Sequence, residues 1–196
     1  KYGLATNWNP INRINLHLET KKMNKNIRDI LNSMKAFLDK PENVYGMHID
    51  QVIVKDTILV TTNFLSPEYP STQKVYDLIN GIKGYIAANN AKETNSPMLN
   101  VWQDSGLYKI QVAIPVNVVI PQNNTYLIKR MVPGKILVAE IKGGEYSARE
   151  ALRQMHLFMT DNQLSAPAIP FESLVTNRME EPDTLKWITK IYYPVF

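Results

Sequence analysis

The stretch Met131-Val-Pro-Gly-Lys-Ile-Leu-Val-Ala-Glu-Ile-Lys-Gly-Gly-Glu-Tyr146 carries the clearest structural signals of the chain. Pro133-Gly134 suits a tight turn whose second central residue has positive φ, so the sequence predicts a hairpin between residues 126–132 and 135–141. Apolar side chains then recur at helical spacing, which predicts a helix over residues 147–162. Ser147, followed three residues later by Glu150, is typical of a capping box at the start of that helix.

The same order of elements occurs earlier in the chain, which indicates an internal duplication. Three short matches carry it: Ile58-Leu-Val with Ile136-Leu-Val, Glu68-Tyr69 with Glu145-Tyr146, and Pro115-Val116 with Pro194-Val195. A helix over residues 71–89 follows Glu68-Tyr69, as the helix over residues 147–162 follows Glu145-Tyr146. The sequence therefore predicts an α+β fold made of two β-α-β-β repeats, residues 45–118 and 124–196, related by a pseudo-two-fold axis. Each repeat is expected to place a helix on an antiparallel sheet, with a central ligand cup between them.

Residues 1–44 are expected to form a separate leading segment. Ile27, Ile30, Leu31, Met34 and Leu38 lie at helical spacing, so an amphipathic helix over residues 24–39 is predicted to end before Pro41. This segment carries eight Lys and Arg residues against four Asp and Glu, whereas residues 45–196 carry fourteen of each. Because the main domain is neutral, no nucleic-acid partner is expected, and the lysines are interpreted as a solvated helix face.

The composition excludes several classes of site. The chain has no cysteine, so disulfides, thiolate metal sites and cysteine nucleophiles are impossible. His17, His48 and His156 are scattered without metal-ligand spacing, so neither a metal nor a cofactor is expected. The apolar runs are too short to cross a bilayer, which predicts no membrane contact and a cytoplasmic domain. The chain begins at Lys1, so an upstream domain, signal or anchor in the same protein stays compatible with the sequence.

The segment from Met131 to Tyr146, the later Pro170-Phe-Glu172 and the closing Thr189-Lys-Ile-Tyr-Tyr-Pro-Val195 together resemble the GyrI-like domain, also called the AraC effector-binding or SOUL-like domain. The resemblance covers residues 45–196. It implies a cup lined by aromatic side chains with a glutamate near its floor, and this glutamate falls on Glu172. In regulators of this family the cup binds drug-like, often cationic molecules, and some standalone relatives hydrolyse cyclopropane-containing toxins. Residues 1–40 faintly resemble the tail of a polyketide-cyclase-like domain.

The candidate site consists of an acid and a set of aromatic residues. Glu172 lies in an apolar strand, where a carboxylate is costly unless it is paired. It is therefore interpreted as a ligand-binding group, and the alternative is a glutamate at the rim of the cup or in a structural pair with Lys or Arg. Aromatic faces attract cations and stack on flat ligands. The aromatic candidates are Tyr69, Trp102, Tyr108, Tyr146, Phe171, Trp187 and Tyr192, with Tyr146 and Trp102 preferred. Strand alternation places Tyr192 and Tyr193 on opposite faces, so only one of them can face the cup.

Three functions are compatible with these residues. The first is a sensor or sequestering module that encloses an apolar or cationic small molecule. The second is a hydrolase that uses Glu172 as a general base or nucleophile, although Leu174 stands where many relatives carry an aromatic residue beside the acid. The third is a protein-interaction domain with a vestigial pocket. A binding module is favoured over an enzyme, and no catalytic residue is assigned otherwise.

Overall fold

The computed structural model describes residues 8–54, 57–131 and 133–196, and it divides the chain into two compact units, Lys1–Val44 and Tyr45–Phe196. The predicted strand over residues 126–132 includes Val132, which lies outside the described residues, as do residues 1–7 of the leading segment. Among the described helices, none combines the length and the apolar character that crossing a membrane requires. The two units are described separately below.

The first unit is dominated by α1 (Pro10–Leu38), which is followed by the short α2 (Pro41–Tyr45). Helix α1 begins fourteen residues before the predicted start at residue 24, so that boundary was wrong. The Asn9-Pro10 pair is a helix start rather than a turn, because the Asn9 side chain accepts a hydrogen bond from the Ile11 amide and Pro10 stands in the first turn. The predicted end before Pro41 is confirmed. No residue of α1 is buried.

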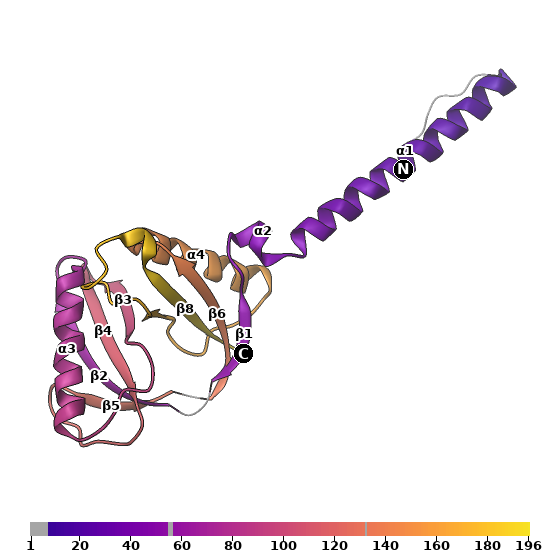
Figure 1. Ribbon diagram of the computed structural model, residues 1–196. Coiled ribbons are helices and arrows are strands. Elements are labelled where there is room, and N and C mark those ends of the chain that lie inside the picture. The colour runs from indigo at the N-terminus through magenta and orange to yellow at the C-terminus, as the bar shows by residue number, and fades with distance from the viewer. Residues whose placement is uncertain (1–7, 55–56, 132) are drawn as a thin grey trace. The chain divides into compact units, whose positions relative to one another are not determined.

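The second unit contains one antiparallel sheet of eight strands in the order β1-β6-β8-β7-β3-β4-β2-β5 (Figure 1). The strands of the first half are β1 (Asp50–Val54), β2 (Ile58–Ser66), β3 (Met98–Asp104) and β4 (Leu107–Val116). Those of the second half are β5 (Leu127–Arg130), β6 (Gly134–Lys142), β7 (Phe171–Leu174) and β8 (Ile188–Val195). Outward from the β3–β7 pair, the order is β3-β4-β2-β5 on one side and β7-β8-β6-β1 on the other. Equivalent strands of the two repeats thus occupy equivalent positions, which is the predicted duplication with pseudo-two-fold symmetry.

The two halves exchange their first strands. Strand β1 pairs with β6 of the second half, and β5 pairs with β2 of the first half. The predicted hairpin between residues 126–132 and 135–141 was therefore wrong. Strand β6 uses both of its edges for β1 and β8, so no edge is left for β5. The Pro133-Gly134 segment instead follows β5, which pairs with β2 of the first half, and leads into β6, which pairs with β8 of the second half, so the exchange ties the halves together.

Each repeat packs a helix on the sheet. Helix α3 (Thr72–Ala88) contacts β2 and β4, and α4 (Glu145–Asp161) contacts β6 and β8 (Figure 1). Two separate cores result. The core under α3 includes Val60, Ile79, Ile82, Ile110 and Ile114, and the core under α4 includes Leu137, Ala151, Met155, Ile191 and Tyr193. Because strand side chains alternate between faces, these residues define the helix-covered face of the sheet, and their neighbours lie on the opposite face.

The predicted capping box was also wrong. Helix α4 begins at Glu145 with Gly144 as its N-cap, so Ser147 lies inside the first turn and does not cap it. Glu150 is used elsewhere, because it accepts hydrogen bonds from Arg153 and Gln154. The other repeat helix does have a serine cap, since the Ser71 side chain accepts a hydrogen bond from the Lys74 amide.

Candidate functional site

A cavity of about 510 Å³ lies between the two halves of the second unit. The residues that line it are Val54, Leu59, Met98, Leu99, Asn100, Gln111, Ala113, Lys129, Arg130, Met131, Pro133, Gly134, Lys135, Ile136, Pro167, Ala168, Ile169, Phe171, Pro194, Val195 and Phe196. They come from all eight strands and from the segments before β6 and β7. The strand exchange helps to build this cavity, because Met131 and Pro133, which lie between β5 and β6, line it.

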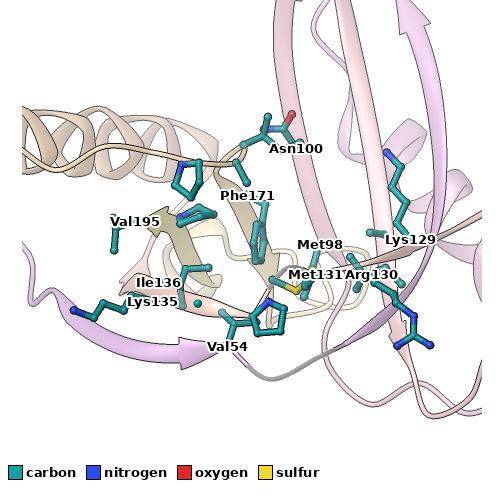
Figure 2. A pocket seen from close by; sticks show the side chains of 18 of the residues that line it. Val54, Met98, Asn100, Lys129, Arg130, Met131, Lys135, Ile136, Phe171 and Val195 are labelled. Carbon is teal, nitrogen blue, oxygen red and sulfur yellow. The ribbon is translucent and has the colours of Figure 1, made fainter.

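The cavity lies on the sheet face opposite the helices. Leu59 lines it while the next residue, Val60, packs in the core under α3, and Ile136 lines it while Leu137 packs in the core under α4. Strand alternation produces this division. Figure 2 shows the side chains of Phe171, Met131, Ile136 and Val54 converging on the same space. The walls are therefore mainly aliphatic, with the rings of Phe171 and Phe196 and two methionines.

Phe171 is the predicted site residue that lines the cavity. Its ring stacks on Tyr192, with centroids 4.9 Å apart and an interplanar angle of 12°. Tyr193 lies on the other face, where its hydroxyl is 3.1 Å from His156 Nδ1 and its ring belongs to the core under α4. The predicted division of Tyr192 from Tyr193 is confirmed. Trp102 shares the cavity's face of β3, since Met98 and Asn100 precede it at even spacing, but it does not line the cavity.

A second cluster of predicted residues lies on the helix-covered face, around Glu172. This acid pairs in register with Leu99 of β3 and Ile191 of β8, both of which are core residues. Its side chain is only 12 % exposed, and Arg178 Nη2 lies 3.5 Å from Glu172 Oε2. Burial raises the pKa of the Glu172 carboxyl, and the charge of Arg178 opposes that rise. The chain thus supplies its own cation to the buried acid.

Arg178 is held by several partners. Its side chain is 5 % exposed, and its Nη2 donates a hydrogen bond to Thr189 Oγ1 at 3.0 Å. The guanidinium carbon lies 4.9 Å from the centre of the Trp187 ring, and the Trp187 indole N–H donates to the Glu181 carbonyl at 2.8 Å. Trp187 therefore stacks on an internal cation, which is the contact that was predicted for a ligand.

Tyr69 and Tyr108 complete this cluster. Their rings meet edge to face with centroids 5.6 Å apart, and the Arg149 guanidinium lies 5.3 Å from the Tyr69 ring centre. Burial raises the pKa of the Tyr69 phenol to about 12, and the negative charges of Glu172 and Glu145 act in the same direction. Tyr69 thus lies within the electrostatic reach of Glu172. Tyr146 does not join the cluster tightly, because it is 75 % exposed in the first turn of α4.

The structure therefore separates the predicted residues by sheet face. Sequence reasoning searched for aromatic and acidic groups, and it missed the aliphatic and amide residues of the cavity, such as Leu59, Met98, Asn100 and Gln111. The alternation of side chains between the two faces of β3 and β4 was the sequence signal that could have identified the cavity residues on these strands. Within the described ranges, no cluster of three or more His, Asp or Glu side chains could hold a metal ion.

Neither a protein-family model nor a curated protein matches the sequence. Solved structures do match the fold. The crystal structure of the EcmrR C-terminal domain has a TM-score of 0.65 and 18% identity, with 76% of this chain and 98% of that chain covered. EcmrR in a complex with DNA, solved by cryo-EM, has a TM-score of 0.67 and 18% identity, covering 91% and 69%. A hydrolase from Listeria innocua has a TM-score of 0.56 and 12% identity, covering 76% and 91%. The chain has the GyrI-like fold that its sequence predicted.

Proposed function

We propose that this chain binds an apolar small molecule as a sensor or sequestering module, and that the ligand is enclosed in the cavity between the two halves. The cavity volume of about 510 Å³ carries this proposal. It falls within the range of roughly 300–1,000 Å³ that is usual for small-molecule sites. Its walls come from both repeats, so a ligand there would contact both and stabilise their association.

The chemistry of the walls favours apolar ligands of variable shape. Met98 and Met131 line the cavity, and methionine side chains adapt to irregular ligands because they are unbranched and polarisable. Phe171 offers one ring face, and its stack on Tyr192 fixes the orientation of that ring. Asn100 and Gln111, which face each other across β3 and β4, supply amide groups for one polar contact.

Cation binding at Glu172 is a second candidate, and the aromatic rings around the acid favour it. Two internal guanidinium groups already lie over aromatic rings there, Arg178 over Trp187 and Arg149 over Tyr69. A cationic ligand would have to displace Arg178 from Glu172, because the two side chains are paired and buried. The same pairing disfavours the hydrolase alternative, since a general base or nucleophile needs access to its substrate. The likeness to a hydrolase concerns the fold alone.

Fluorescence titration with N-phenyl-1-naphthylamine, a neutral apolar probe, tests the proposal. Saturable binding is expected, and a ligand at a hundred times its Kd adds about 2.7 kcal/mol to stability in a matched thermal-shift experiment. Ala113 lines the cavity, so Ala113→Leu is expected to weaken binding at least about tenfold by filling it. Ala87→Leu, an exposed position on α3, is the matched control. Unchanged affinity of a folded Ala113→Leu protein would disprove binding in this cavity.

A further inference from the structure

The charged side chains that line the cavity, among the residues that the structure describes, all have the same sign. Lys129, Arg130 and Lys135 line it, and none of the other lining side chains that the structure describes is a carboxylate. A site bordered by cations and walled by apolar side chains has a positive potential, which low-dielectric walls strengthen. A cationic ligand would enter this potential at a cost, whereas an anionic ligand would be attracted.

Lys129 has the most direct relation to the cavity. It pairs in register with Leu59, a lining residue, so both side chains lie on the cavity's face of the sheet. By contrast, Arg130 pairs with Ile58, a residue packed against the core under α3, and Figure 2 shows its guanidinium pointing away from the cavity. The charged end of Lys135 also points away in that view. Lys129 is therefore placed to meet a polar group on a ligand, and Lys135 contributes to the field at longer range.

Two of the described carboxylates, Glu140 and Glu172, do not cancel this field. Glu140 lies on the same face of β6 as Ile136, but it does not line the cavity, and Lys190 Nζ lies 3.4 Å from its Oε2. Glu172 lies on the helix-covered face, where Arg178 pairs with it. Within the described part of the chain, no ion pair joins Lys129 to a carboxylate. The amides of Asn100 and Gln111 add hydrogen-bonding capacity beside the apolar walls.

We infer that the cavity selects amphipathic anions, molecules with an apolar body and one carboxylate-like group, over cations of the same shape. This inference rests on the proposed function, because it names the ligand class of the same cavity. The apolar body would contact Phe171, Met98 and Met131, and the anionic group would lie on the Lys129 side. The selectivity is thus opposite to that expected for a ligand that pairs with Glu172.

Three fluorescent probes with one pyrene body test the inference: pyrenebutyrate, pyrenebutanol and pyrenebutyl-trimethylammonium. Each is titrated against the full chain at low and high salt. Pyrenebutyrate is expected to bind about tenfold more tightly than the ammonium probe at low salt, with pyrenebutanol between them, and salt is expected to reduce the difference. Lys129→Met is expected to weaken pyrenebutyrate about threefold to fivefold and to leave pyrenebutanol unchanged. Lys142→Met, at an exposed position on β6 that does not line the cavity, is the control.

The outcomes separate the inference from the proposed function. If all three probes bind equally, or the ammonium probe binds best, and Ala113→Leu abolishes binding, the anion preference is wrong and the cavity still binds apolar molecules. If no probe binds, both fail. If Lys129→Met weakens pyrenebutanol as much as pyrenebutyrate, Lys129 acts through local structure rather than charge, which also overturns the assignment. Circular dichroism of each variant verifies that the fold is retained.

Discussion

Arg178 Nη2 lies 3.5 Å from Glu172 Oε2, and both side chains are almost fully buried. An acid that the sequence indicates as a ligand group is thus neutralised by a residue six positions later in the chain. A buried charge that loses its partner is strongly destabilising, because the remaining ion stays desolvated. The pair therefore links the candidate cation site to the stability of the fold, and four predictions follow from the placement of these and related residues.

Arg178→Met is expected to lower the free energy of unfolding by about 3 kcal/mol near neutral pH, since it leaves the Glu172 carboxylate buried without a counter-charge. Urea denaturation monitored by circular dichroism measures this. Lys190→Met is the matched control, because the Lys190 side chain is 38 % exposed where it pairs with Glu140, and a change below about 1 kcal/mol is expected there. Equal losses in the two variants would show that the Glu172 pair is no more important than a surface pair.

The pH dependence of stability follows from the direction of the Glu172 shift. Burial raises the pKa of the Glu172 carboxyl above its ordinary value of 4.5, so the folded state holds the proton at pH values where the unfolded state has lost it. Stability from this group is therefore fully present below pH 4.5 and declines as the pH rises through the folded pKa. Arg178→Met removes the opposing cation, so the decline should extend to higher pH. Urea midpoints at a series of pH values test this, with Glu172→Gln expected to lack the decline.

The helix caps give a prediction about stability alone. Ser71→Ala is expected to cost about 1 kcal/mol, because it removes the acceptor for the Lys74 amide at the start of α3. Ser147→Ala should cost clearly less, since Gly144 is the N-cap of α4 and Ser147 lies within its first turn. Thermal unfolding of the two variants provides the comparison. A larger loss for Ser147→Ala would support the capping box that the sequence suggested.

The sequence predicted the fold class well because the duplication repeats along the chain. Alternation and helical spacing are local signals, and they correctly located α3, α4 and the strands that surround them. Strand pairing is not local: nothing in residues 126–141 indicates that β5 pairs with β2 rather than with β6. The start of α1 was missed for a different reason, because Asn9-Pro10 is compatible with both a turn and a helix start.

The candidate site was harder to predict than the fold. Glu172 was expected to be buried in an apolar strand, and it is, but its partner Arg178 comes from the irregular segment after β7, where no periodic pattern fixes a position. The cavity residues are mostly aliphatic, and such residues look the same in sequence whether they fill a core or line a cavity. Phe171 and Glu172 are adjacent in sequence, yet alternation places them on opposite faces of the sheet.

The last prediction concerns the second candidate site. Arg178→Met removes the internal cation that contacts both Glu172 and the Trp187 ring, so a small quaternary ammonium ion should then bind in its place. Benzyltrimethylammonium is expected to bind the variant at least about fivefold more tightly than it binds the unaltered chain, as measured by calorimetric titration. The double variant Glu172→Gln with Arg178→Met should lose this gain, because it keeps the space but removes the negative charge. If the double variant binds as tightly as Arg178→Met, the acid does not recognise the cation, and the aromatic ring alone accounts for binding. If Arg178→Met gains nothing while remaining folded, Arg178 is a structural partner of Glu172 and does not stand in for a ligand.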